Sequence, residues 1–146
     1  MIKQLTKDTV ISILKCGYKV NDELSAMFKT HGISLPQFNV LRILRGRKGE
    51  AANLSTIQEQ MIHKMSNTTR LIDKLIEGGY VNRFVCKKNR RKIEIFITKK
   101  GLELLSSLDL QLDAKEQFLI NNLEDKEKEE LMRLLSKVQT SITSET

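Results

Sequence analysis

A cluster of basic side chains is the feature of this sequence that could do the most chemistry. Residues 83–100 hold eight lysines and arginines against a single acid, Glu94. Their excess of seven positive charges equals the formal net charge of the whole 146-residue chain. Five of these cations surround Asn89 within residues 87–92, between two short apolar runs. This pattern predicts a basic turn between two strands, which would present its charge to a polyanion.

The polyanion that suits such a turn best is the phosphate backbone of a nucleic acid. Each neutralised phosphate releases counterions and adds affinity without reading sequence. For an isolated basic stretch, a solvated run of charge without any partner is the alternative interpretation. The elements expected on either side of the cluster distinguish the nucleic-acid interpretation from the solvated run of charge.

Helices should dominate the chain, because one proline and seven glycines leave few interruptions. A first helix is expected over about residues 5–30, ending at His31 and Gly32. Ser34 can cap a second helix, Gln37 can complete its capping box, and Pro36 suits the first turn.

Two short helices and a hairpin are expected next. The first short helix should begin at Ser55 or Thr56. The second should follow His63-Lys64, end at Gly78-Gly79 and turn three residues inward, namely Leu71, Ile72 and Leu75. The strands of the hairpin are predicted over Tyr80–Cys86 and Ile93–Ile97, from their alternation of side chains.

Two more helices are expected after the hairpin. Thr98 can cap the first, whose inward face would carry Leu102, Leu105 and Leu108. The last helix has acids in its first turn, where the helix dipole favours them: Glu124, Asp125 and Glu127. Its apolar stripe has spacings of three and four residues: Leu131, Leu134, Leu135, Val138 and Ile142. A lone chain has little left to cover this stripe, which predicts that two copies associate.

Two short helices followed by a basic hairpin are typical of the winged helix-turn-helix plan, and the sequence resembles the MarR family of bacterial transcriptional regulators. Asn53–Met61 resembles the first helix of the family's motif, and Lys64–Leu75 resembles its recognition helix. Glu77–Arg83 is similar to the family's turn into the wing, Asn89–Arg91 to the wing itself, and Ile97–Gly101 to the exit from the wing. Ser34–Phe38 resembles the start of the family's second helix.

The resemblance implies a mainly α fold with a small β-hairpin wing, in which residues 1–146 form a single domain. Residues 34–101 would be the DNA-binding part, and residues 1–33 and 102–146 would supply dimerisation helices. It also implies a homodimer that binds double-stranded DNA at an inverted-repeat operator and represses transcription. A small aromatic effector would occupy a pocket bordered by the first, second and fifth helices.

Two positions in the wing depart from the family's usual pattern. Asn89 stands where the family commonly has an aspartate before its arginine pair, and Cys86 stands at another commonly acidic place. An asparagine offers a neutral hydrogen bond in place of a charged bidentate pair, which orients an arginine less firmly. Because both changes remove negative charge, we expect higher nonspecific affinity for DNA.

Ten residues are candidates for contact with DNA. If the apolar side of the recognition helix packs inward, its outward residues can reach base edges in the major groove; these are Ser66, Asn67, Thr69, Arg70 and Lys74. The cations of the wing would neutralise phosphates. They are Lys87, Lys88, Arg90, Arg91 and Lys92, and the two arginines are the strongest candidates.

Other functions find less support in the residues. We identify no catalytic site, no metal-ligand cluster and no cofactor motif, so an enzyme is not predicted. No apolar stretch is long enough to span a membrane, and the N-terminus lacks the core of a signal peptide, so a cytoplasmic protein is expected. Cys86 lies beside Lys87 and Lys88, which favours a reactive thiol, although packing is the more common use of a strand cysteine and of Cys16.

Three alternatives to a sequence-specific regulator stay open at this point. The chain could be a nonspecific architectural DNA-binding protein, which would show no preferred site. It could be a thiol-based redox-sensing regulator that uses Cys86. It could also be a winged-helix module that binds proteins, in which case its affinity would be insensitive to salt.

Overall fold

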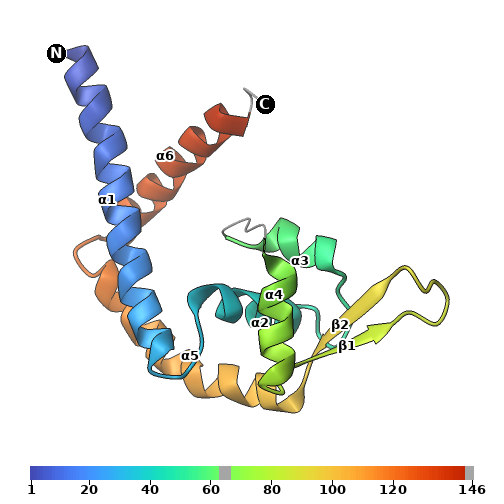
Figure 1. Ribbon diagram of the computed structural model, residues 1–146. Helices are drawn as coiled ribbons and strands as arrows, with labels where there is room; N and C mark the ends of the chain where they lie inside the picture. Colours follow the sequence, from blue (N-terminus) through green and yellow to red (C-terminus); the bar gives the residue numbers. More distant parts are fainter. Residues whose placement is uncertain (63–66, 144–146) are drawn as a thin grey trace. The chain divides into compact units, whose positions relative to one another are not determined.

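The computed structural model of the protein describes residues 1–62 and 67–143. These residues form six helices and one hairpin, whose arrangement can be followed in Figure 1. In chain order the elements are α1 (Ile2–Lys29), α2 (Leu35–Gly46), α3 (Leu54–Gln60), α4 (Thr68–Glu77), β1 (Val81–Val85), β2 (Ile93–Ile97), α5 (Lys99–Leu119) and α6 (Asp125–Thr143). The predicted fold class, mainly α with a small β-hairpin, is confirmed. Within the described ranges, no helix has both the length and the apolar character needed to cross a membrane.

The chain divides into two compact units, Met1–Leu110 and Gln111–Thr146. The first unit contains α1 to α4, the hairpin and the beginning of α5. The second contains the end of α5 and all of α6. That residues 1–146 act as one domain stays a prediction.

The core of the first unit is built around α2. Most residues of this helix are buried, and Phe38 stacks on Phe28 of α1 with ring centroids 4.3 Å apart. The predicted capping box starts the helix: the Ser34 N–H donates to Gln37 Oε1 at 2.8 Å, and the Gln37 N–H donates to Ser34 Oγ at 3.2 Å. This reciprocal pair satisfies two backbone donors at the helix start and so fixes where α2 begins.

Helix α3 begins at Leu54, which is one residue before Ser55 and two before Thr56, the two predicted starts. Asn53 is its N-cap, because Asn53 Oδ1 accepts hydrogen bonds from the backbone N–H of Thr56 at 2.7 Å and from its hydroxyl at 2.8 Å. Asparagine ranks among the strongest N-cap residues. The predicted start was therefore wrong, because Asn53 and not Ser55 or Thr56 caps the helix.

Helix α4 places Ile72 and Leu75 in the core, as predicted. Leu71, predicted to be a third inward residue, is only half-buried, and the buried residue of the first turn is Thr68. The helix ends before Gly78-Gly79, as predicted, and Gly79 takes a φ of 78°. That left-handed conformation is readily open to glycine.

The hairpin pairs β1 antiparallel to β2, from Val81 opposite Ile97 to Val85 opposite Ile93. Each end of β1 is one residue shorter than the predicted strand over 80–86. The other edge of β2 pairs with Ala52 through Ile95. The Ala52 N–H donates to the Ile95 carbonyl at 3.0 Å, and the Ile95 N–H donates to the Ala52 carbonyl at 2.8 Å. The outer edge of β1 has no strand partner among the described residues.

Helix α5 packs closely against the base of the hairpin. The predicted cap is present, since the Gly101 N–H donates to Thr98 Oγ1 at 3.1 Å. Leu105 and Leu108 are fully buried, but Leu102, predicted to share their face, is 40% exposed. Successive residues of a helix are 100° apart, so Gly101 and not Leu102 lies on the buried face with these two leucines.

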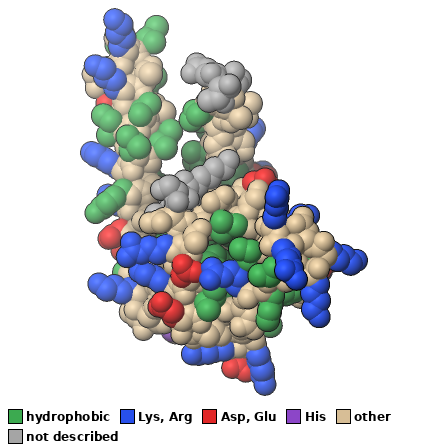
Figure 2. Space-filling model, turned by 45° about the vertical axis from the view of Figure 1, so that its right-hand side comes forward, with side chains coloured by type: hydrophobic (Ala, Val, Ile, Leu, Met, Phe, Trp, Pro, Cys, Tyr) green, Lys and Arg blue, Asp and Glu red, His purple; other side chains and the backbone are tan. Residues whose placement is uncertain are grey.

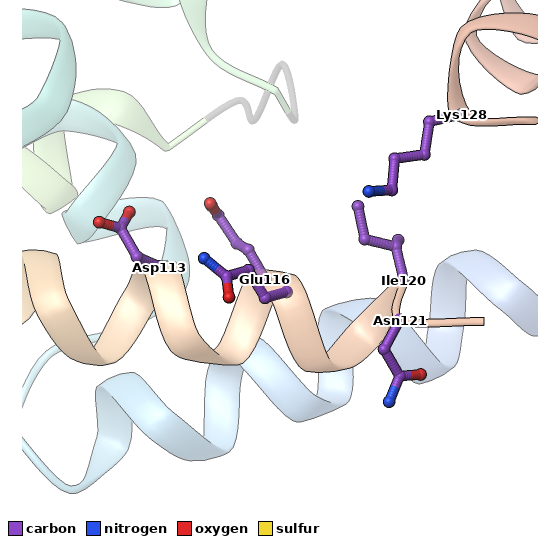
Figure 3. A pocket seen from close by; sticks show the side chains of 6 residues that line it. Asp113, Glu116, Ile120, Asn121 and Lys128 are labelled. Atoms are coloured by element: carbon purple, nitrogen blue, oxygen red, sulfur yellow. The ribbon is translucent and has the colours of Figure 1, made fainter. Parts of the chain in front are cut away.

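Helix α6 belongs to the second unit and contains no buried residue. Its first turn is acidic as predicted, and the Glu124 N–H donates to Glu127 Oε1 at 3.0 Å. The predicted apolar stripe is uncovered in the single chain, with only Leu135 half-buried and Ile142 66% exposed. Figure 3 shows an open hollow in the same unit, to which Asp113, Glu116, Ile120, Asn121 and Lys128 contribute.

Candidate nucleic-acid interface

Helix α4 presents a polar and basic surface to solvent. Thr69, Arg70 and Lys74 are exposed, while Ile72 and Leu75 hold the opposite side of the helix in the core. A helix that enters a DNA groove needs this separation of faces, because one side must contact the DNA while the other stays packed against the core.

Asn67 and Ser66 were predicted together with these helix residues. Asn67 is exposed and stands just before α4 as its N-cap, with its side chain making no capping hydrogen bond. Residues at the N-terminal end of a recognition helix are the ones that contact base edges. Asn67 is therefore well placed for that contact, although it precedes the helix. Ser66 lies outside the described residues.

The turn of the hairpin presents the five predicted cations, and all of them are exposed: Lys87, Lys88, Arg90, Arg91 and Lys92. Backbone hydrogen bonds shape this turn, from the Cys86 N–H to the Lys92 carbonyl and from the Lys92 N–H to the Asn89 carbonyl, each at 2.9 Å. Asn89 Oδ1 accepts a hydrogen bond from the Arg91 N–H at 3.1 Å. Asn89 thus orders the main chain of the turn and leaves the arginine side chains to solvent.

An ion pair connects α4 to the hairpin. Arg83 Nη1 on β1 lies 2.9 Å from Asp73 Oδ1 on α4. Sequence reasoning counted Arg83 only as one of the cluster's cations and did not pair it, because the ten-residue separation crosses a helix end, a turn and a strand. The pair uses one cation of the cluster internally and joins the two candidate DNA-contacting elements.

Basic side chains are numerous on the side of the molecule where the hairpin projects. Figure 2 shows lysines and arginines there with apolar side chains between them. Glu94, the acid of the cluster, is half-buried opposite Phe84 in the ladder. The electrostatic character of the hairpin is therefore positive, and it is strongest at the turn.

The two cysteines and the possible metal ligands are the other chemically active residues of the described chain. Cys16 is exposed and Cys86, which directly follows β1, is half-buried, and both are free thiols. Across the described parts of the chain, no three histidine, cysteine or acidic residues come together as a metal site would require. These observations leave the basic surface of α4 and the hairpin as the candidate functional site.

Two short helices followed by a basic hairpin define a winged helix-turn-helix protein. Comparison with known proteins narrows this class. The sequence model of the MarR family matches residues 33–93. The transcriptional regulator PapX of Escherichia coli is 27% identical over 110 residues, which cover 75% of this chain and 67% of PapX.

Solved structures show the same fold. A mutant of MarR from Escherichia coli, complexed with operator DNA, has a TM-score of 0.78 at 24% identity, covering 86% of this chain and 89% of that one. BpsR of Bordetella bronchiseptica, whose DNA binding is regulated by 6-hydroxynicotinic acid, has a TM-score of 0.80 at 17% identity, covering 90% of this chain and 98% of that one. The family model and the curated relatives thus support an assignment of this chain to the MarR family of helix-turn-helix transcriptional regulators.

Proposed function

We propose that this regulator binds double-stranded DNA as a homodimer and represses transcription from an inverted-repeat operator. One observation carries the proposal: α4 exposes Arg70 and Lys74, and the Asp73–Arg83 ion pair holds this helix to a hairpin with five exposed cations at its turn. A helix for the major groove and a basic wing for the neighbouring backbone are the two parts that such binding needs. The operator complex of Escherichia coli MarR supports the same use of the fold.

The two parts would divide the work. Arginine and asparagine form bidentate pairs with guanine and adenine, so Arg70 and Asn67 are proposed to read bases, with Ser66, Thr69 and Lys74 beside them. The cations of the turn are proposed to meet phosphates or the minor groove, where sequence is read poorly. The helix would supply preference for a site, and the wing would supply affinity for DNA in general.

Exposed apolar side chains support the proposed homodimer. On α1, Leu5, Leu14 and Tyr18 are each at least 66% exposed. On α6, Met132 is 70% exposed and no residue is buried. Large uncovered apolar surfaces mark association sites. A second copy would cover them and place two recognition helices roughly 34–36 Å apart, one turn of DNA, which is why an inverted repeat is expected.

Substitutions in α6 test the dimer. Leu131→Glu/Leu134→Glu should give a monomer in light scattering at micromolar concentration and lose affinity for a full operator, because charge is then buried in the interface. Lys137→Glu introduces the same side chain at an exposed polar position of α6 and should leave the dimer intact. A wild-type chain that is monomeric and still binds DNA fully would contradict the proposal.

An aromatic acid is the proposed effector. The regulation of BpsR by 6-hydroxynicotinic acid supports this class of ligand. Such a molecule can release DNA only if it binds the DNA-competent and DNA-incompetent dimers with different affinity. A panel of phenolic and pyridine carboxylic acids should contain a compound that raises the melting temperature and lowers DNA affinity. If no compound does either, this part of the proposal fails while DNA binding stands.

The experiment that tests DNA recognition is to sequence the genomic fragments that the purified protein retains. A shared inverted repeat, bound more tightly than scrambled DNA at matched salt, is the expected result. Fragments without a common site would indicate an architectural binder. Retention of no DNA at low salt would indicate a protein-interaction module. A loss of binding in peroxide that Cys86→Ser prevents would assign the regulation to the thiol.

A further inference from the structure

The hairpin has two faces, and its register assigns each residue to one of them. Val81 and Ile95 are each 1% exposed and mark the inner face. Partners in an antiparallel ladder share a face and alternate along each strand. The inner face therefore also carries Arg83 and the last pair of the ladder, Val85 opposite Ile93.

The inner face emerges from the protein at this last pair. Arg83 is held by Asp73 of α4. One step further toward the turn, Val85 is 59% exposed and Ile93 is 42% exposed. We name these two residues the apolar pair. It lies between α4, whose outward side chains are proposed to enter the major groove, and the cations of residues 87–92.

The charge around the apolar pair decides what could cover it. A second copy bound at this place would bring two basic turns together, and like charges in contact are unfavourable. The edge of a DNA groove has the opposite character: anionic phosphates alternate with deoxyribose groups that present C–H surface. Cations beside an apolar patch match phosphates beside a sugar.

We propose that Val85 and Ile93 pack against deoxyribose groups of one DNA strand. This strand runs between the groove that α4 enters and the groove or backbone that the turn of the hairpin reaches. The inference rests on the proposed DNA binding and adds two uncharged contact residues to it. These residues supply affinity that does not depend on salt, because no counterion is released when an apolar side chain meets a sugar. They also fix how far the wing lies along the strand.

The test is a salt titration of DNA affinity for Val85→Thr and Ile93→Thr. Threonine keeps the β-branched shape, so the strand is retained. Each variant should bind the duplex about fivefold more weakly at every salt concentration, with the slope of log affinity against log salt unchanged. Phe84→Thr is the matched control, since Phe84 is 54% exposed on the same strand but on the opposite face. It should bind like the wild type.

Arg91→Ala separates this inference from the proposed function. If the wild type binds DNA with a salt slope that Arg91→Ala reduces, while both threonine variants bind like the wild type, the apolar contact is wrong and DNA binding stands. If Phe84→Thr weakens binding as much as Val85→Thr does, the opposite face of the hairpin meets the DNA and the inference fails. If the threonine variants change only the oligomeric state in light scattering, a second copy covers the pair and the inference fails. If the wild type binds no DNA, the proposed function fails first.

Discussion

Asp73 of α4 and Arg83 of β1 form an ion pair, with 2.9 Å between carboxylate and guanidinium. Both side chains are more than 40% exposed, so solvent screens the pair and its contribution to the free energy of unfolding is small, at most about 1 kcal/mol. Its effect is on geometry. If α4 reads a groove and the hairpin binds the backbone, as proposed, both must meet one DNA duplex in register, and this pair joins them next to the proposed interface.

Asp73→Ala should therefore lower discrimination between operator and scrambled DNA more than it lowers stability. Removal of the Asp73 carboxylate leaves the charge of Arg83 uncompensated, so affinity for scrambled DNA should hold or rise while affinity for the operator falls. The measurement is the ratio of the two affinities at fixed salt. Glu77→Ala removes the same charge from the exposed end of α4 and should leave the ratio higher than Asp73→Ala does. Equal ratios would show that the ion pair has no positional effect.

Arg70→Ala or Asn67→Ala should weaken binding to the preferred site by about 1–3 kcal/mol and binding to scrambled DNA much less. A lost bidentate contact to a base affects only the sequences that offer that base. Salt-titrated affinities for both duplexes provide the measurement. If Arg70→Ala weakens both duplexes equally, the helix does not read the site.

Arg91→Ala should weaken binding to every duplex by a similar factor. One lost phosphate contact should flatten the log–log salt dependence by about 0.9. The same titration measures this slope, and Lys137→Gln in α6 serves as a control for general loss of charge. A variant of Arg91 that abolishes the preference for the operator would make the wing the sequence-reading element.

Gly101→Ala should destabilise the first unit by about 1–3 kcal/mol. A Cβ at this position would stand 2.5 Å from the Tyr80 carbonyl oxygen and 2.7 Å from Ile97 Cγ1, so α5 would have to move away from the hairpin. Gly17→Ala is the matched control in helix α1, because nothing lies within 4 Å of its added Cβ. That change should instead stabilise the protein by about 0.5–1 kcal/mol. Urea unfolding at one protein concentration measures both.

Asn39→Leu should raise the free energy of unfolding by about 1 kcal/mol. Asn39 on α2 is 1% exposed, and neither polar atom of its side chain has a hydrogen-bond partner among the described residues. Leucine keeps the branching at Cγ and carries no polar atom to desolvate. Thermal unfolding provides the measurement, with Asn39→Ala as a check for overpacking by the larger side chain. If both variants lose stability, a buried water satisfies the Asn39 amide, and the asparagine stabilises the core.

The parts of the fold that local chemistry controls could be predicted from the sequence. The capping box at Ser34, the cap at Thr98 and the basic turn depend on side chains a few residues apart, and all are present. Leu102 was misplaced because three leucines spaced by three drift around a helix, while Gly101 offers no apolar signal and is buried through close packing. The start of α3 was misplaced because Asn53, Ser55 and Thr56 are all residue types that can cap a helix, and the cap is Asn53.

The candidate site was predictable in its charge and less so in its geometry. The cations of the turn are exposed because lysine and arginine side chains remain in water unless they are paired. The Asp73–Arg83 pair depends on how α4 meets the hairpin, and no periodicity within either element reports that angle. The apolar pair required the register of the hairpin, which alternation alone leaves undefined by one residue.

The edge of β1 also bears on how the protein behaves at high concentration. Ala52 pairs with β2, whereas the outer edge of β1 has no strand partner among the described residues. This edge lies beside the exposed side chains of Phe84 and Val85. Edges of this kind join to one another and start aggregation unless charge keeps them apart. The lysines and arginines of the turn provide that repulsion, so the side chains proposed to hold DNA also keep unbound molecules in solution. Solubility should therefore limit how many of these charges the protein can lose, whether by substitution or by acetylation of its lysines.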